Sequence, residues 1–195
     1  MITVRLARPS TDGEAVAAIY RPAVESSVAS FETDAPSASV MSQRMAATLE
    51  RTPWLVGISG GAVAGYAYAG RFRERAAYRW SVEISAYVDP AAHGRGIGRQ
   101  LYEVLVPILR RQGFVNLLAG ITLPNPASVR LHEAIGMELT GTYRRVGYKF
   151  GAWHDVAWYA RRLAEPAGAP PEPVPLPDLL AHDAASLAGF GLDLG

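Results

Sequence analysis

The 195-residue sequence contains no cysteine. This absence excludes disulfides, thiolate metal sites and a cysteine acyl-enzyme. The four histidines, at positions 93, 132, 154 and 182, show neither His-x-x-x-His nor His-Glu-x-x-His spacing, so no bound metal is expected. Any chemistry therefore depends on oxygen and nitrogen groups.

Strong charge and long apolar runs are also missing. The chain carries 19 basic and 18 acidic residues, a formal net charge of +1, which gives no general attraction to nucleic acid or to anionic membranes. There is no long apolar span and no signal-peptide pattern at the start. We therefore expect a soluble cytoplasmic protein with neither a nucleic-acid nor a membrane partner.

The most informative feature that is present is the run His93-Gly94-Arg95-Gly96-Ile97-Gly98, which joins a strand-like stretch to an amphipathic helix. Its alternating glycines leave a backbone that a bulky anion can approach, and N–H groups at the start of a helix attract phosphate. The run matches neither the Walker loop nor the Gly-x-Gly-x-x-Gly dinucleotide fingerprint. It therefore predicts a pyrophosphate site of another kind.

Apolar periodicity indicates both strands and helices. Strands are expected near residues 2–8, 53–58, 62–68, 79–88, 115–122, 138–144 and 154–163. Helices are expected after a capping box formed by Thr11 and Glu14, near 39–51, after the glycine run and at about 125–135. Hairpin and crossover connections together predict an α/β (α+β) fold, with a mixed, mostly antiparallel central sheet flanked by helices.

A domain boundary is expected near residue 164, which gives one domain over 1–164 and a tail over 165–195. Six prolines between residues 166 and 177 predict a stiff, extended linker. The tail then has a brief apolar pattern at Leu179, Leu180, Leu187 and Phe190. It either docks on the domain or stays mobile, and we favour a dispensable extension.

Several stretches carry a resemblance to a known family. In the glycine run, His93, Gly96 and Gly98 occupy the positions of a pattern that reads Gln or Arg, two residues, Gly, one residue, Gly or Ala. The matching stretches elsewhere are 52–56, 64–70, 77–83, 128–134 and 147–156. Together they resemble the GNAT superfamily of N-acetyltransferases and its phosphinothricin N-acetyltransferase branch, over residues 2 to 163. The resemblance implies the GNAT fold, acetyl-CoA as co-substrate, no metal, and a homodimer.

The resemblance also implies two catalytic residues. Glu83 lies on the polar side of strand 79–88, where a carboxylate in a partly dry cleft can take a proton from an ammonium substrate, directly or through a water. The alternative is an ordinary glutamate on a solvated strand face. His132 stands where many GNAT enzymes carry a tyrosine that protonates the departing thiolate. Three roles stay open for it: the acid, a helper in deprotonating the amine, or a structural helix residue.

The remaining implied site residues form two sets. The acetyl-CoA set comprises Tyr87, Val88, His93, Gly94, Arg95, Gly96, Ile97, Gly98, Arg99, Asn125 and Ser128. Asn125 is also well placed to cap a helix. The amine-substrate set comprises Phe31, Arg73, Arg75, Tyr78 and Ser85, because guanidinium groups bind the anionic groups of a small amino acid. A solvated basic loop is the alternative for these arginines, and no catalytic role is expected for His154.

The resemblance implies transfer of an acetyl group to the amino group of a small amino acid such as phosphinothricin, methionine sulfoximine or methionine sulfone. Without cysteine or a Ser/His/Asp arrangement, we expect direct attack in a ternary complex. The resemblance implies that a backbone N–H near Tyr87 and Val88 holds the oxyanion. The alternatives are another amine, such as a polyamine or a protein N-terminus, and a non-catalytic acyl-CoA-binding sensor. A sensor needs neither Glu83 nor His132.

Overall fold

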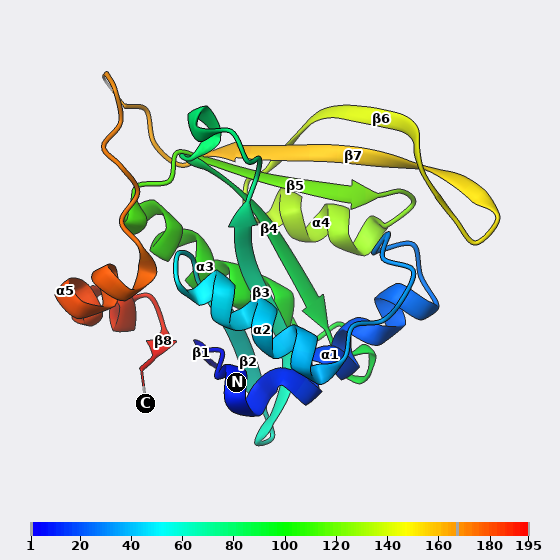
Figure 1. Ribbon diagram of the computed structural model, residues 1–195, viewed down its shortest axis with the longest axis horizontal. Coiled ribbons are helices and arrows are strands. Elements are labelled where there is room, and N and C mark those ends of the chain that lie inside the picture. Colours follow the sequence, from blue (N-terminus) through cyan, green and yellow to red (C-terminus); the bar gives the residue numbers. More distant parts are fainter. Residues whose placement is uncertain (1, 167, 195) are drawn as a thin grey trace.

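A computed structural model describes residues 2–166 and 168–194. An open sheet organises the chain, as Figure 1 shows. Its strands run in the order β6-β7-β5-β4-β3-β2-β1-β8. Their bounds are β1 Thr3–Leu6, β2 Trp54–Ser59, β3 Ala62–Arg71, β4 Ser81–Val88, β5 Asn116–Thr122, β6 Glu138–Lys149, β7 Ala152–Arg162 and β8 Leu192–Asp193. Among the described strands, β4–β5 and β1–β8 pair in parallel and the other neighbouring pairs are antiparallel, which confirms the predicted mixed, mostly antiparallel sheet.

Helices cover both faces of this sheet. They are α1 (Pro9–Glu25), α2 (Ala38–Leu49), α3 (Ile97–Gln112), α4 (Pro126–Ala134) and α5 (Leu176–Gly189), with short 3-10 turns η1 (Ala76–Tyr78) and η2 (Pro90–Ala92). Alternation along β4 sends Val82 and Ile84 into the core formed with α3. Tyr87 points to the opposite face, where α1 and α2 pack on Trp54, Val56 and Tyr66. Glu83 and Ser85 share that second face with Tyr87.

The predicted start of the first helix is wrong. Helix α1 begins at Pro9, whose fixed φ suits the first helical position. The buried carboxylate of Asp12, rather than Thr11 with Glu14, accepts from the Arg8 N–H at 2.7 Å and from the Arg5 guanidinium at 2.7 and 2.8 Å. Burial alone favours the neutral acid, but these donors hold the pKa of Asp12 below its usual value.

The last two strands of the domain are longer than predicted at their shared turn. Strand β6 extends to Lys149 and β7 starts at Ala152, so Phe150 and Gly151 form the turn, both with positive φ (51° and 77°). An irregularity separates Tyr143 from Gly147, because Arg145 adopts a φ of 49° and its N–H donates to Asp155 at 2.7 Å. This hairpin projects from one end of the sheet.

The C-terminal tail docks on the domain. Helix α5 and β8 bury Leu176, Leu179, Leu187 and Leu192 in the main core, and β8 pairs with the edge strand β1. The proline-rich segment contacts the domain too, since Trp80 Nε1 donates to the Pro171 carbonyl at 2.7 Å. Among the described residues, no helix is long and apolar enough to cross a bilayer.

Candidate active site

Strands β4 and β5 pair for only three residues and then separate. The ladder joins Ser81 to Asn116 and ends at Glu83 opposite Leu118. Beyond that point β4 stays paired with β3 and β5 stays paired with β7. The sheet therefore opens into a gap, and a cavity of about 580 Å³ lies there, lined by Ile84 to Val88 of β4 and by Gly120 to Thr122 of β5. Beyond Glu83 the edge of β4 on the β5 side has no strand partner, so backbone groups of this edge are available to a ligand.

The predicted glycine loop closes one end of this cavity. Gly94 and Gly96 adopt φ values of 76° and 75°, and Gly96 is the N-cap of α3. The first N–H groups of α3 have no partner within their own helix, and the cavity lies against Ile97, Gly98 and Arg99. A side chain on Gly98 would press on Leu131, 3.1 Å away. Gly96 and Gly98 therefore leave the backbone without side chains at these two positions, where α3 begins.

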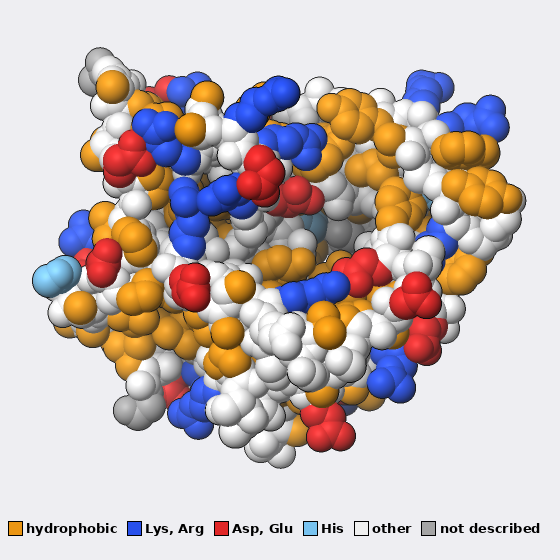
Figure 2. All heavy atoms as spheres, viewed as in Figure 1, with side chains coloured by type: hydrophobic (Ala, Val, Ile, Leu, Met, Phe, Trp, Pro, Cys, Tyr) orange, Lys and Arg blue, Asp and Glu red, His pale blue; other side chains and the backbone are white. Residues whose placement is uncertain are grey.

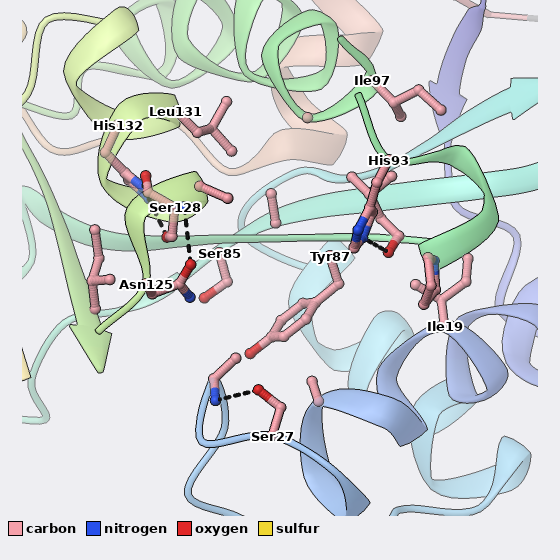
Figure 3. A pocket seen from close by; sticks show the side chains of 18 of the residues that line it. Ile19, Ser27, Ser85, Tyr87, His93, Ile97, Asn125, Ser128, Leu131 and His132 are labelled. Atoms are coloured by element: carbon pink, nitrogen blue, oxygen red, sulfur yellow. Dashed lines mark hydrogen bonds between the residues drawn. The ribbon is translucent and has the colours of Figure 1, made fainter. Parts of the chain in front are cut away.

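His93 departs from the family pattern at the start of this loop. Its Nε2 lies 3.0 Å from the carbonyl oxygen of Val88, which fixes the ring across the end of β4 (Figure 3). The contact keeps His93 in the cavity wall. Arg95, by contrast, is exposed and does not line the cavity.

The other side of the cavity is the start of α4. The Asn125 side chain accepts from the Ser128 N–H at 3.1 Å, which confirms the predicted helix cap. Ser85 and Tyr87 of β4 approach Asn125, Ser128 and the Ser27 loop around the same space, as Figure 3 shows. The structure therefore brings most of the predicted acetyl-CoA set together.

His132 is buried behind Ser128. Its Nδ1 lies 2.8 Å from the Ser128 carbonyl and its Nε2 lies 3.1 Å from the Tyr102 hydroxyl. Nδ1 can only donate to a carbonyl, so in the neutral imidazole Nε2 is the acceptor and Tyr102 the donor. Burial lowers the pKa of His132, against the opposing hydrogen bond to Ser128. The ring is therefore a neutral imidazole whose two nitrogens are both engaged.

Glu83 lies at the point where the β4–β5 ladder ends. Its side chain is partly buried on the α1–α2 face. Burial raises the pKa of this carboxyl, and the Arg73 guanidinium opposes that change. Glu83 is not itself among the residues that line the cavity, whose β4 lining begins with the next residue, Ile84. A partly buried carboxylate with a raised pKa is suited to act as a proton acceptor.

The predicted amine-substrate residues are divided between the cavity and its surroundings. Ser85 lines the cavity, whereas Phe31, Arg73, Arg75 and Tyr78 do not. The Arg73 guanidinium lies 4.5 Å from the Phe72 ring centre, and Tyr78 meets the same ring edge-on at 5.7 Å. Lys and Arg side chains gather along one rim of a hollow in this face, over the β3–β4 connection (Figure 2).

Sequence reasoning missed several contributors to the site, among them Tyr102, Ser27 and Ala29. Tyr102 follows Leu101 on the buried stripe of α3, so a polar group among apolar neighbours was the available signal. Ser27 and Ala29 line the cavity from the α1–α2 connection, and no local pattern marks them. Among the described residues, no group of three or more His, Asp or Glu side chains could hold a metal ion.

This geometry agrees with the comparison to known families. Residues 5–158 match the acetyltransferase (GNAT) domain. The chain belongs to the GNAT acetyltransferase family, and the predicted family, fold and acyltransferase class are confirmed.

Two related enzymes and one solved structure show which acetyltransferases the chain is similar to. The phosphinothricin N-acetyltransferase of Streptomyces viridochromogenes is 42% identical over 169 residues, which cover 86% of this chain and 91% of the relative. The L-methionine sulfoximine/L-methionine sulfone acetyltransferase of Salmonella typhimurium is 42% identical over 115 residues, 59% of this chain and 67% of the relative. A phosphinothricin acetyltransferase of Sinorhizobium meliloti, solved in complex with acetyl-CoA, superposes with a TM-score of 0.82 at 39% identity, covering 89% of this chain and 95% of that one.

Proposed function

We propose that this chain transfers an acetyl group from acetyl-CoA to the amino group of a small anionic amino acid of the phosphinothricin or methionine sulfoximine type. The observation that carries the proposal is the ending of the β4–β5 ladder at Glu83. The partly buried Glu83 comes directly before Ile84, the first β4 residue in the lining of the cavity that the N-terminus of α3 closes. The names of the relatives support the substrate class.

The cavity suits acetyl-CoA in size and chemistry. Its volume of about 580 Å³ falls within the usual range for ligand pockets. The N–H groups at the start of α3 would hold the pyrophosphate, because they combine unpaired donors with the positive end of the helix dipole. A Cβ on Gly94 would meet nothing within 4 Å, so this part of the loop is open to a bulky ligand. The unpaired edge of β4 would bind the amides of the pantetheine arm.

In the proposed reaction, Glu83 accepts a proton from the substrate ammonium, directly or through a water. The freed amine attacks the thioester carbonyl, so that a C–N bond forms and the C–S bond breaks. The nitrogen then loses a second proton and the departing thiolate takes up a proton, so the products are the N-acetyl amine and CoA with a free thiol. A backbone N–H near Tyr87 and Val88 would donate to the oxyanion. Transfer is direct, because the chain has no cysteine to carry the acetyl group.

His132 has a positioning role in this scheme. Its Nδ1–H is committed to the Ser128 carbonyl and its Nε2 to Tyr102. His132 lines the cavity, but with both nitrogens engaged the ring has no free N–H to offer a departing thiolate. We therefore assign His132 to holding the first turn of α4, and with it Asn125 and Ser128, against the cavity.

The proposed working form is a homodimer, with a second copy covering the β6–β7 hairpin. This hairpin exposes more than half of each of six apolar side chains, and Figure 2 shows hydrophobic side chains gathered in this region. They are Leu139, Tyr143, Val146, Tyr148, Phe150 and Trp153. Exposed apolar surface of this kind marks an interface. Sedimentation should give a dimer that Trp153→Glu converts to monomer, and a monomeric wild-type chain would contradict this.

A substrate panel tests the proposed function. Thiol release from acetyl-CoA should be fast with phosphinothricin, L-methionine sulfoximine and L-methionine sulfone, and mass spectrometry should show one added acetyl group on each amine. Spermidine and a peptide N-terminus should react much more slowly. Preference for either of these would redirect the assignment to another amine, and acetyl-CoA binding without any turnover would support a sensor.

A further inference from the structure

The connection between α1 and α2 forms a wall of the cavity without belonging to any helix or strand. Ser27 and Ala29 line the cavity directly, and Phe31 follows them. An irregular segment holds its shape only where other groups fix its backbone. Several of those groups belong to residues of β6, which contacts this connection.

Lys149, the last residue of β6, holds this connection by its backbone. Its ammonium group donates to the carbonyls of Val24 at 2.6 Å, Ser27 at 3.0 Å and Ser30 at 2.7 Å. An ammonium group has three N–H donors, so all of them are used. The side chain is buried, and it places a cation against the last turn of α1, where helix carbonyls attract positive charge.

The surroundings of Lys149 leave it without a direct carboxylate partner among the described residues. Burial lowers the pKa of Lys149, and the charge of Glu32 opposes this change. Glu32 itself pairs with Arg44, at 2.7 and 3.1 Å. Lys149 therefore contributes by hydrogen bonding to three carbonyls, and its partners lie 119 to 125 positions away in the sequence.

Gly147 lies two residues before Lys149 on the same face of β6, and its lack of a side chain leaves room for the Phe31 ring. A Cβ at position 147 would fall inside contact distance of Cε2, Cζ and Cδ2 of Phe31, the farthest of them at 2.8 Å. The Phe31 ring also lies 6.3 Å from the ring of His154, the residue opposite Gly147 on β7. The ring thus occupies the space that glycine leaves free.

A second set of contacts fixes the same segment from the α1 side. The Tyr20 hydroxyl lies 2.6 Å from Ser30 Oγ and donates to Glu32 at 3.0 Å. Burial raises the pKa of Tyr20 to about 12, so the hydroxyl keeps its proton at neutral pH. Residues 24 to 32 are therefore held from both sides.

We infer that Gly147 and Lys149 determine the amine specificity of the site, by positioning the cavity wall at Ser27 and Ala29 together with Phe31, which follows them outside the lining. Neither residue lines the cavity. Lys149 sets the path of the backbone and Gly147 sets the place of the Phe31 ring. This inference rests on the proposed function for its substrate, but the positioning of the wall can be measured without it.

Gly147→Ala is the deciding variant, because it removes no hydrogen bond and only displaces the Phe31 ring. We expect the KM for L-methionine sulfone to rise roughly 10- to 100-fold, as for other small displacements of a binding group. The KM for acetyl-CoA should change less than about threefold. Gly141→Ala is the matched control, since it lies on the same strand and a Cβ there meets nothing within 4 Å. An unchanged KM for the amine in Gly147→Ala would overturn the inference.

Lys149→Met tests the backbone contacts. It keeps a long side chain but leaves three carbonyls without their donor. Hydrogen exchange of the amides in 24–31 should accelerate, while exchange in β2 and β3 stays slow. Lys149→Gln, which retains two N–H donors, should restore part of the protection. Unchanged exchange in Lys149→Met would contradict the role of Lys149.

These outcomes separate the inference from the proposed function. If the wild-type chain acetylates none of the amines, the proposed function fails, and the exchange data still decide whether Lys149 holds the wall. If the wild-type chain acetylates methionine sulfone and Gly147→Ala loses amine and acetyl-CoA affinity equally, the specificity role fails alone. Should Lys149→Met not fold, Gly147→Ala decides.

Discussion

The hydroxyl of Tyr102 lies 3.1 Å from Nε2 of His132, and both groups are buried. Through the other ring nitrogen, His132 is joined to the Ser128 carbonyl at 2.8 Å. This chain of contacts connects the core of α3 to the first turn of α4, which carries the capping Asn125. The neutral His132 ring therefore links α3 to α4 by hydrogen bonds.

The protonation of His132 follows from this arrangement. Because burial lowers its pKa from the ordinary 6.5, the unfolded chain binds the proton more readily than the folded chain. The contribution of His132 to stability is therefore present above pH 6.5 and is lost as the pH falls toward the lower folded pKa. An NMR titration of the imidazole should give a midpoint below 6.5. A midpoint at or above 6.5 would show that the ring is not held as described.

Glu83→Gln should lower kcat by about 10²-fold or more, because the amide cannot accept the ammonium proton. The wild-type kcat/KM should fall on the acidic side with a midpoint above 4.5, the ordinary pKa of a glutamate, because burial raises the pKa of Glu83. The variant should lack this acidic limb. Glu25→Gln, at the exposed end of α1, serves as the control. A variant that keeps the same pH profile would exclude Glu83 as the base.

The same substitution should stabilise the fold at neutral pH. The folded-state pKa of Glu83 is raised, so the neutral acid is favoured in the folded chain, and this favourable contribution is lost as the pH rises from 4.5 through the raised pKa. Above that range the charged carboxylate costs stability, which Gln removes. The Tm of Glu83→Gln should exceed that of the wild type at pH 7.5 and approach it near pH 4. A lower Tm at pH 7.5 would mean that Glu83 has stabilising partners in the folded chain.

Because the tail packs on the main core, we expect substitutions in it to lower the free energy of unfolding. Leu187 of α5 is fully buried against the main core, so Leu187→Ala should cost about 2–5 kcal/mol of unfolding free energy in a urea titration. Leu194→Ala is the matched control, because that side chain is 44% exposed. If both variants lose equally little, the tail is not an integral part of the fold.

The strands and helices of the domain follow from local patterns. Residues 79–88 alternate between two faces, and the structure buries Val82 and Ile84 on one and turns Glu83 and Ser85 to the other. The start of α1 could not be found in this way. Asp12, which accepts from the backbone N–H at the start of α1, is held by the Arg5 guanidinium of β1. No local sequence rule includes that partner.

The site likewise combines features that local sequence predicts with contacts between residues far apart in the chain. The glycine loop and the Asn125 cap are local features, and the structure has both where the sequence places them. The wall at Ser27 and Ala29, the Tyr102–His132 contact and the Lys149 contacts join residues far apart in the chain. The roles of the rim residues Arg73, Arg75 and Tyr78 stay predictions, because they lie outside the cavity lining.

Calorimetric titration with acetyl-CoA tests the central claim most directly, using Gly96→Val and Gly60→Val in parallel. Both glycines have positive φ, 75° at Gly96 and 60° at Gly60, so both variants strain the backbone. Only Gly96 lies at the start of α3. The account predicts that the wild type and Gly60→Val bind one acetyl-CoA per chain, and that Gly96→Val binds it at least about tenfold more weakly. Absence of binding to the wild type, or equal binding to Gly96→Val, would contradict the account.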